Sequence, residues 1–207
     1  LPKAYGEELC EGIQVITPSR RGVAGTETLN RMLQEALNPP SPKKREKKVR
    51  ETIFREGDRV MQTKNNYSLE VFNGDVGVVE GMDYSRRKWY SPDGEPHFYT
   101  SETKEMQVCY DTRRECVGYD DNSADELELA YATTIHKSQG SEYDIVVIVL
   151  MQSAYYMLQR NLLYTAITRG KKLVLVIGSR WAAGKAIETN TVKGRRTSLA
   201  ERLAANP

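Results

Sequence analysis

The chain has 207 residues, which is enough to bury the core of one large domain or two small ones. Its 30 lysine and arginine residues nearly balance 28 aspartate and glutamate residues. The net charge of +2 permits a local basic face but does not by itself indicate nucleic-acid binding. No apolar run approaches the roughly 18 residues of a membrane-spanning helix, so we expect a soluble protein without membrane contact. The three cysteines fit no zinc-ligand spacing and are predicted to be reduced thiols.

Residues 1–53 are typical of the start of an α/β domain. Residues 13–17 read as a short strand that Pro18 ends, and a loop with Arg20 and Arg21 follows. Apolar residues then recur at helical spacing and predict one apolar stripe along a helix. The stripe consists of Leu29, Met32, Leu33, Ala36 and Leu37.

Residues 40–51 are strongly charged and poor in apolar side chains. We interpret them as a solvated linker, and a strip that contacts nucleic-acid phosphates is the alternative. The cations of this basic segment are Lys43, Lys44, Arg45, Lys47, Lys48 and Arg50.

Turn signals become frequent between residues 54 and 124. Gly57, Gly74 and Gly94 each stand beside an aspartate or asparagine, and short strand-like segments lie between these turns. Such segments are expected at residues 59–63, 76–79 and 106–110. This pattern predicts a small antiparallel β-barrel inserted into the α/β domain.

The α/β pattern returns in residues 125–207. Residues 145–150 and 173–177 are continuous apolar runs, as expected for strands of a parallel sheet that are buried on both faces. Residues 130–134 read as a further strand, and residues 153–168 read as a helix. The fold class is therefore α/β with an inserted barrel.

Arg169 follows that helix and directly precedes a predicted strand. An arginine in this place either favours the helix dipole or acts as an arginine finger, which stabilises charge on a transferring phosphoryl group. The sequence contains no phosphate loop of the form G-x-x-x-x-G-K-[ST]. We therefore expect no nucleotide hydrolysis by this chain alone, and no metal site.

Residues 133–142 form a polar, hydroxyl-rich loop that leads to a buried strand. Ligands bind at such loops in parallel sheets, and Gly140 would let the backbone approach a ligand closely. His136 is either an ordinary surface histidine or, with its neighbours, a contact to a nucleic-acid backbone. Arg20 and Arg21 are likewise either solvated charges or a second phosphate contact.

These segments resemble motifs of superfamily-1 helicases, in that family's order. Residues 131–142 (YATTIHKSQGSE) resemble motif V, and residues 163–169 (LYTAITR) resemble motif VI. Residues 17–22 (TPSRRG) resemble motif IV of the RecD-like group. The segments GDRVMQ, NNY and FNGDVG, which begin at residues 57, 65 and 72, are similar to the small Src-homology-3-like (SH3-like) barrel of that group.

The resemblance implies the C-terminal half of a RecD-like, superfamily-1B DNA helicase, a bacterial cytoplasmic enzyme of DNA repair and recombination. The fold would be a RecA-like parallel sheet of the P-loop-NTPase type, without its own P-loop, and with an SH3-like barrel inserted. ATP and Mg²⁺ would be bound mainly by an N-terminal RecA-like domain of the same parent chain. The parent would move 5′ to 3′ on single-stranded DNA. A non-catalytic module that binds single-stranded nucleic acid is the alternative.

The matched motif positions also imply site residues. Arg169 would be the arginine finger, and Arg21, or else Arg20, would reach the γ-phosphate from motif IV. Further residues that face the nucleotide would be Gly140, Glu142 and Thr165. Residues that contact DNA would be Thr134 and His136 of motif V, with Asn65, Asn66 and Tyr67 of the barrel. Relatives usually have alanine after the finger arginine, whereas this chain has Gly170.

Overall fold

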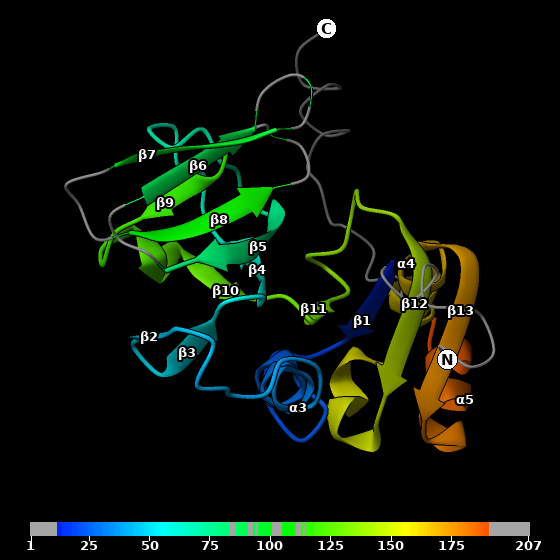
Figure 1. Cartoon of the computed structure of the whole chain (residues 1–207). Helices are drawn as coiled ribbons and strands as arrows, with labels where there is room; N and C mark the ends of the chain where they lie inside the picture. The colour runs from blue at the N-terminus through cyan, green and yellow to red at the C-terminus, as the bar shows by residue number, and fades with distance from the viewer. Residues whose placement is uncertain are drawn as a thin grey trace, which may run out of the picture.

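The computed structural model describes residues 12–190, apart from residues 83–85, 91, 92, 94, 101–104, 111, 112 and 114. Two sheets organise these residues (Figure 1). One is a four-stranded parallel sheet in the order β11-β1-β12-β13, and the other is a five-stranded antiparallel sheet in the order β10-β4-β5-β8-β9. The chain leaves the parallel sheet after β1 and returns to it at β11, which confirms the predicted α/β domain with an inserted barrel.

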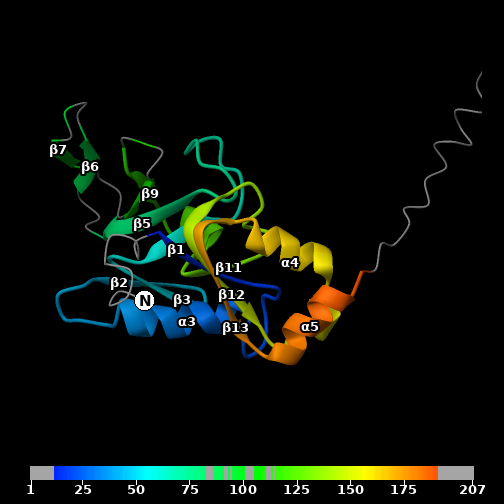
Figure 2. The ribbon, with the colours of Figure 1, turned by 90° about the vertical axis from the view of Figure 1, so that its right-hand side faces the viewer.

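The parallel sheet consists of β1 (Ile13–Thr17), β11 (Ala132–Thr134), β12 (Tyr143–Leu150) and β13 (Gly170–Gly178). Helices α4 (Arg160–Ile167) and α5 (Arg180–Glu188) cover one face, and α3 (Thr26–Leu37) lies on the other side of the sheet (Figure 2). The core against α4 and α5 includes Val146, Ile148 and Leu150 of β12. Within the described part of the chain, no helix combines the length and apolar content needed to cross a membrane.

The two continuous apolar runs differ in burial. β12 is a central strand between β1 and β13, and it is buried on both faces, as predicted. β13 is the edge strand, and Val176 and Ile177 are 50% and 56% exposed. The prediction of a doubly buried strand is therefore wrong for residues 173–177.

Helix α3 buries a polar side instead of the predicted apolar stripe. Thr26, Asn30 and Gln34 are buried at four-residue spacing, which places them on one helix face. Met32 and Leu37 of the stripe are 61% and 67% exposed. The hydrophobic pattern therefore indicated a helix correctly but indicated the wrong face for burial.

The backbone opposite α3 explains this choice. The side-chain amide of Asn30 donates to the carbonyls of Leu129 (2.8 Å) and Ala132 (2.9 Å) and accepts from the Ala132 N–H (2.7 Å). β11 is an edge strand, so its backbone polar groups need partners outside the sheet. Asn30 supplies these partners, which an apolar side chain does not.

Asp58 connects α3 to the barrel. Its fully buried carboxylate accepts hydrogen bonds from Gln34 Nε2 (2.5 Å), Asn38 Nδ2 (2.6 Å), the Arg55 N–H (2.7 Å) and the Tyr131 O–H (2.9 Å). Four donors satisfy a group that would otherwise be costly to bury. Burial and the adjacent Asp58 charge raise the pKa of Tyr131, which keeps its hydroxyl protonated as a donor.

The antiparallel sheet forms the barrel and contains β4 (Arg59–Gln62), β5 (Val76–Gly81), β8 (Met106–Tyr110), β9 (Val117–Tyr119) and β10 (Leu127–Leu129). Its core includes Val60, Val79, Met106 and Val108. β10 pairs with β4, so the barrel sheet extends five residues past the predicted boundary at residue 124. β6 (Arg86–Tyr90) and β7 (Pro96–Thr100) pair as a separate two-stranded sheet.

The basic segment is part of a β-hairpin and not a linker. The hairpin consists of β2 (Glu46–Val49) and β3 (Thr52–Arg55). Lys47 forms a 2.8 Å ion pair with Asp121, and Arg50 forms one with Asp125. These two cations attach the hairpin to the segment before β10.

The prediction of reduced cysteines is wrong for two of the three. Cys109 and Cys116 form a disulfide. They lie opposite each other because β8 and β9 pair in antiparallel register, with Val108 opposite Val117. Cys10 lies outside the described residues.

We predict that Asn30→Ala lowers the free energy of unfolding by about 3 kcal/mol, because it leaves three buried backbone groups without partners. Urea denaturation monitored by circular dichroism measures this change. Met32→Ala on the same helix is the matched control and should change stability by less than about 0.5 kcal/mol. The opposite order of effects would show that α3 packs through its apolar stripe.

Two functional edges of the parallel sheet

Parallel strands give the sheet two chemically different edges. At the carboxyl edge, where the strands end, β1 and β11 lead into the segments that contain Arg21 and His136. At the amino edge, where the strands begin, Glu142 precedes β12 and Arg169 precedes β13. Each edge therefore gathers residues from segments far apart in the sequence.

Arg169 joins the two motif segments at the amino edge. Its guanidinium donates to the carbonyls of Ser141 (3.0 Å) and Thr165 (3.1 Å) and to Thr168 Oγ1 (3.2 Å). The Tyr143 N–H in turn donates to the Arg169 carbonyl at 2.8 Å. Among the described residues no carboxylate pairs with Arg169, so its charge is not neutralised within the chain. A half-buried guanidinium without a carboxylate partner fits a phosphate ligand.

The other residues predicted to face a nucleotide lie around Arg169. Glu142 is exposed and 3.5 Å from Lys171 Nζ. Gly140 has a φ of +89°, a left-handed conformation that favours glycine. The Thr165 hydroxyl donates within α4 to the Asn161 carbonyl at 2.9 Å. Of these three residues, only Thr165 contacts Arg169 directly.

Gly170, the departure from the usual alanine, has a local cause. A Cβ added at this position would lie 2.4 Å from Val174 Cγ2, which is shorter than any ordinary contact. Glycine here therefore allows β13 to begin immediately after Arg169.

At the carboxyl edge, a rigid loop presents Arg20 and Arg21. The Thr17 hydroxyl donates to the Ala24 carbonyl at 2.7 Å, and the Thr26 N–H donates to the Ser19 carbonyl at 3.1 Å. Arg20 is paired with Glu27 at 3.1 Å. Arg21 is exposed and makes no ion pair within the part of the chain that the structure describes. The loop thus holds a free cation at a fixed place.

Thr134 and His136 lie beside this loop. β11 is paired with β1 so that Thr134 is opposite Thr17, and the Ile135 N–H donates to the Thr17 carbonyl at 3.0 Å. Thr134 Oγ1 accepts from the Lys137 N–H at 3.2 Å, and His136 is exposed. The two motif V residues predicted to contact DNA therefore share an edge with Arg21.

The structure does not bring Arg21 and Arg169 together. Ile16 of β1 is paired with Ile148 of β12, and Ile148 is paired with Val176 of β13, so Ile16 and Val176 lie at the same height in the sheet. Arg169 lies seven residues before Val176. At roughly 3.3 Å per residue, this separates the two edges by about 23 Å along the strands. The backbones of the two arginines therefore lie at opposite edges of the sheet, and nothing in the described residues supports the prediction that both reach one γ-phosphate.

The barrel residues predicted to contact DNA have different environments. Asn65 Oδ1 accepts from the Asn73 N–H at 2.9 Å, and Asn66 donates to Glu126 at 3.0 Å and accepts from the Leu69 N–H at 3.1 Å. Both asparagines thus hold their loop in shape. Tyr67 is 76% exposed, and its ring meets that of Phe72 edge to face, with ring centroids 6.1 Å apart. Among these three residues, Tyr67 has the side chain available to a ligand.

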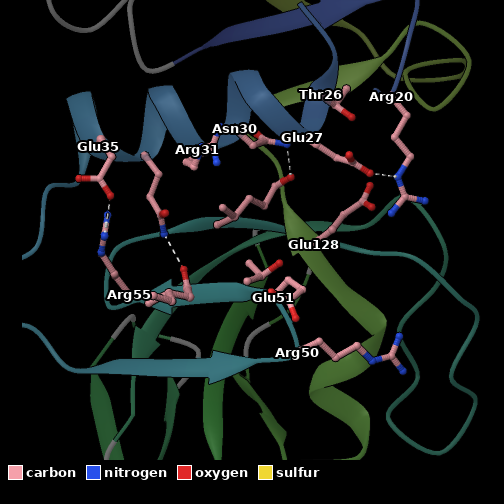
Figure 3. Close-up of a pocket in the computed structure, with 14 residues that line it drawn as sticks. Arg20, Thr26, Glu27, Asn30, Arg31, Glu35, Arg50, Glu51, Arg55 and Glu128 are labelled. Carbon is pink, nitrogen blue, oxygen red and sulfur yellow. Dashed lines mark hydrogen bonds and ion pairs between the residues drawn. The ribbon is translucent and has the colours of Figure 1, made fainter. Parts of the chain in front are cut away.

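A cleft of about 600 Å³ lies between α3, the β2–β3 hairpin and β10 (Figure 3). Its charged lining is mixed in sign and includes two ion pairs across the described residues, Arg20 with Glu27 and Arg55 with Glu35. Neither Arg169 nor Glu142 lines it. The amino edge is thus not part of this cleft.

Two family models match the chain. The model described as "ATP-dependent RecD-like DNA helicase SH3 domain" matches residues 29–90, and "UvrD-like helicase C-terminal domain" matches residues 129–177. The ATP-dependent RecD2 DNA helicase of Deinococcus radiodurans is 34% identical over 194 residues, which cover 94% of this chain and 24% of the relative. The chain belongs to the RecD-like DNA helicases.

A second RecD relative and a solved helicase structure are also similar to this chain. The RecBCD enzyme subunit RecD of Mycolicibacterium smegmatis is 32% identical, over 92% of this chain and 29% of the relative. A Pif1 helicase from Bacteroides in complex with ADP-AlF3 and ssDNA has a TM-score of 0.49 and 19% identity, covering 92% of this chain and 44% of that one. The chain spans about a quarter of the length of the RecD2 relative and corresponds to the C-terminal helicase region.

Sequence reasoning missed one feature of this RecD-like chain. The predicted helix 153–168 is broken, since the 3₁₀ helix η2 (Gln152–Met157) ends before α4 begins at Arg160. The break leaves Tyr155 and Tyr156 at the carboxyl edge with exposed rings. Two adjacent tyrosines between the small or apolar residues Ala154 and Leu158, which are buried, were the available signal.

We predict that Asn66→Ala lowers the free energy of unfolding by about 1–2 kcal/mol, because it removes two hydrogen bonds that shape the loop. Tyr67→Ala, one residue further, should leave stability within about 0.5 kcal/mol, because the ring is exposed. Thermal unfolding of both variants measures the difference. Equal losses would mean that Tyr67 is also a structural residue.

Proposed function

We propose that this chain is the second motor domain of an ATP-dependent DNA helicase that moves 5′ to 3′ on single-stranded DNA. The observation that carries the proposal is Arg169, an unpaired guanidinium held between the motif V and motif VI segments. The chain has no phosphate loop, so the arginine must act on a nucleotide bound elsewhere. The relatives' names, which describe DNA helicases, support the same activity.

The residues of the amino edge fit ATP held by the N-terminal RecA-like domain of the parent chain. Arg169 would donate to the γ-phosphate, and Gly140, Glu142 and Thr165 would line the nucleotide beside it. Mg²⁺, bound mainly by that N-terminal domain, would neutralise charge on the phosphates. Arg169 supplies the same kind of stabilisation from this side, as a planar donor with a permanent positive charge.

The residues of the carboxyl edge fit the DNA backbone. Thr134 and His136 would contact it, and Arg21 would supply a phosphate-neutralising charge beside them. This assignment moves Arg20 and Arg21 from the nucleotide to the DNA, because they share an edge with His136 and not with Arg169. Tyr67 of the barrel would contact the strand further along.

Residues 135–142 connect the two edges and suggest how the motor is coupled. At one end the Ile135 N–H is bonded to Thr17, and at the other the Ser141 carbonyl accepts from Arg169. A shift of Arg169 toward phosphate would release Ser141 and move this segment. Closure on ATP and reopening after hydrolysis would therefore reach the DNA-contacting residues through a single short segment.

The isolated chain should bind little nucleotide and should not hydrolyse ATP. Comparing ATP turnover of the 207-residue chain with that of the full-length protein, with and without single-stranded DNA, tests the proposal. Turnover only in the full-length protein, stimulated by DNA, is the expected result. Helicase-like turnover by the chain alone, or none in the full-length protein, would refute it.

We predict that Arg169→Ala in the full-length protein lowers kcat for ATP by about 10³-fold or more, as for other arginine fingers. Single-stranded DNA affinity without nucleotide should change little. Lys172→Ala is the matched control. It removes an exposed cation three residues after Arg169, and this cation pairs with Asp144. Near-normal turnover in Arg169→Ala would exclude the finger role.

We predict the opposite separation for Arg21→Ala. DNA affinity should fall at every sequence, and the slope of log K against log salt should decrease by about one unit, since one phosphate contact is lost. ATP turnover at saturating DNA should stay within about threefold. Arg31→Ala, an exposed cation of α3, is the control and should leave the slope unchanged. A kcat effect as large as that of Arg169→Ala would return Arg21 to the nucleotide.

A further inference from the structure

Three aromatic rings lie together on the surface at the end of the parallel sheet. Tyr155 and Trp181 are stacked, with ring centroids 6.0 Å apart and planes 19° apart. Tyr156 meets Tyr155 edge to face at 5.4 Å. Tyr155 and Trp181 are 47% and 49% exposed, and Tyr156 is 90% exposed. We refer to these three residues as the aromatic platform.

The small residues beneath the platform turn its rings outward. Ala154 of η2 and Ala182 of α5 are buried against the sheet, so the adjacent Tyr155 and Trp181 lie at the surface. This arrangement leaves large apolar area in contact with water. Single exposed apolar residues are common, but a cluster of three aromatic rings is typical of a binding site.

The platform continues the edge that carries the proposed DNA contacts. Tyr155 and Tyr156 follow the end of β12, and Trp181 follows the end of β13. In the same way, His136 follows β11 and Arg21 follows β1. The four strand ends are neighbours in the order β11-β1-β12-β13. A strand of DNA lying across this edge from His136 past Arg21 would therefore arrive at the platform.

The charge of this region also fits a polyanion. Residues 145–187 contain no aspartate or glutamate, although the whole chain has 28, and they contain six cations. Lys171 and Lys172 pair with acidic residues that precede this stretch. At the platform itself, Lys185 Nζ lies 5.5 Å from the centroid of the Tyr155 ring, and Arg180 is exposed without an ion pair to any described residue.

We propose that the aromatic platform is a base-stacking site for single-stranded DNA, with Tyr156 and Trp181 stacking on unpaired bases and Arg180 and Lys185 next to the phosphates. This inference rests on the proposed function and adds a subsite to it. Aromatic rings flanked by cations are the usual combination for binding single strands without sequence preference, because every base has a flat face. An acidic protein surface would match the cations but not the stacked rings.

The test uses the full-length protein and a fluorescent oligothymidylate, with affinity measured by anisotropy at several salt concentrations. Tyr156→Ala and Trp181→Ala should each weaken binding by about 10-fold, the scale of one base–aromatic stack. Tyr156→Phe and Trp181→Phe should stay within about twofold, since they keep a ring. The salt slope should not change in any of the four variants, because no phosphate contact is removed.

A second measurement locates the stacked base. Oligonucleotides that lack one base at successive positions should show one or two positions where the wild type loses affinity, and Tyr156→Ala should lose nothing further there. Tyr156 is 90% exposed, so its replacement does not disturb packing, and thermal unfolding confirms this for each variant.

The outcomes separate this inference from the proposed function. If the wild type binds DNA and the two alanine variants bind equally well, the platform is not a DNA site, but the helicase proposal stands. If the alanine variants instead change the molecular mass in solution, the platform is an interface between protein copies and the inference is wrong. If the wild type does not bind single-stranded DNA, the proposed function itself fails.

Discussion

The buried carboxylate of Asp58 is the contact on which the relation between barrel and parallel sheet depends. It draws donors from α3, from β3 and from the segment between β10 and β11, and Asn30 adds bonds to the backbone on both sides of that segment. Hydrogen bonds are directional, whereas apolar contacts allow sliding. A polar junction of this kind fixes the angle of the barrel, and with it the position of Tyr67 relative to the carboxyl edge.

The two edges of the sheet divide the proposed work of the motor. Arg169 lies at the edge suited to a phosphate supplied by another domain, while Arg21 and His136 lie at the edge suited to DNA. Residues 135–142 are hydrogen-bonded at both ends, to Thr17 and to Arg169, so they link the two edges directly. In the proposed motor, this single short segment would connect the residues that face the nucleotide with those that face DNA, and no longer pathway would be needed.

Much of this arrangement was predictable from the sequence, and the failures have physical causes. β12 was predictable because a continuous apolar run fits a central parallel strand. The buried face of α3 was not, because Asn30 and Gln34 are polar and their partners include backbone groups about 100 residues away, which no local pattern reveals. The placement of Arg21 and Arg169 at opposite edges was also predictable. One follows its strand and the other precedes its strand, and parallel strands place such positions at opposite edges.

The position of β1 has a consequence for how the protein is made. β1 lies between β11 and β12, yet 115 positions separate Thr17 from Ala132, where β11 begins. During synthesis at roughly 5–20 residues per second, β1 waits several seconds without either neighbour while the whole barrel emerges. Of the two sheets described here, the barrel sheet is therefore the first whose strands are all present, and the parallel sheet assembles around a strand that was translated long before its partners.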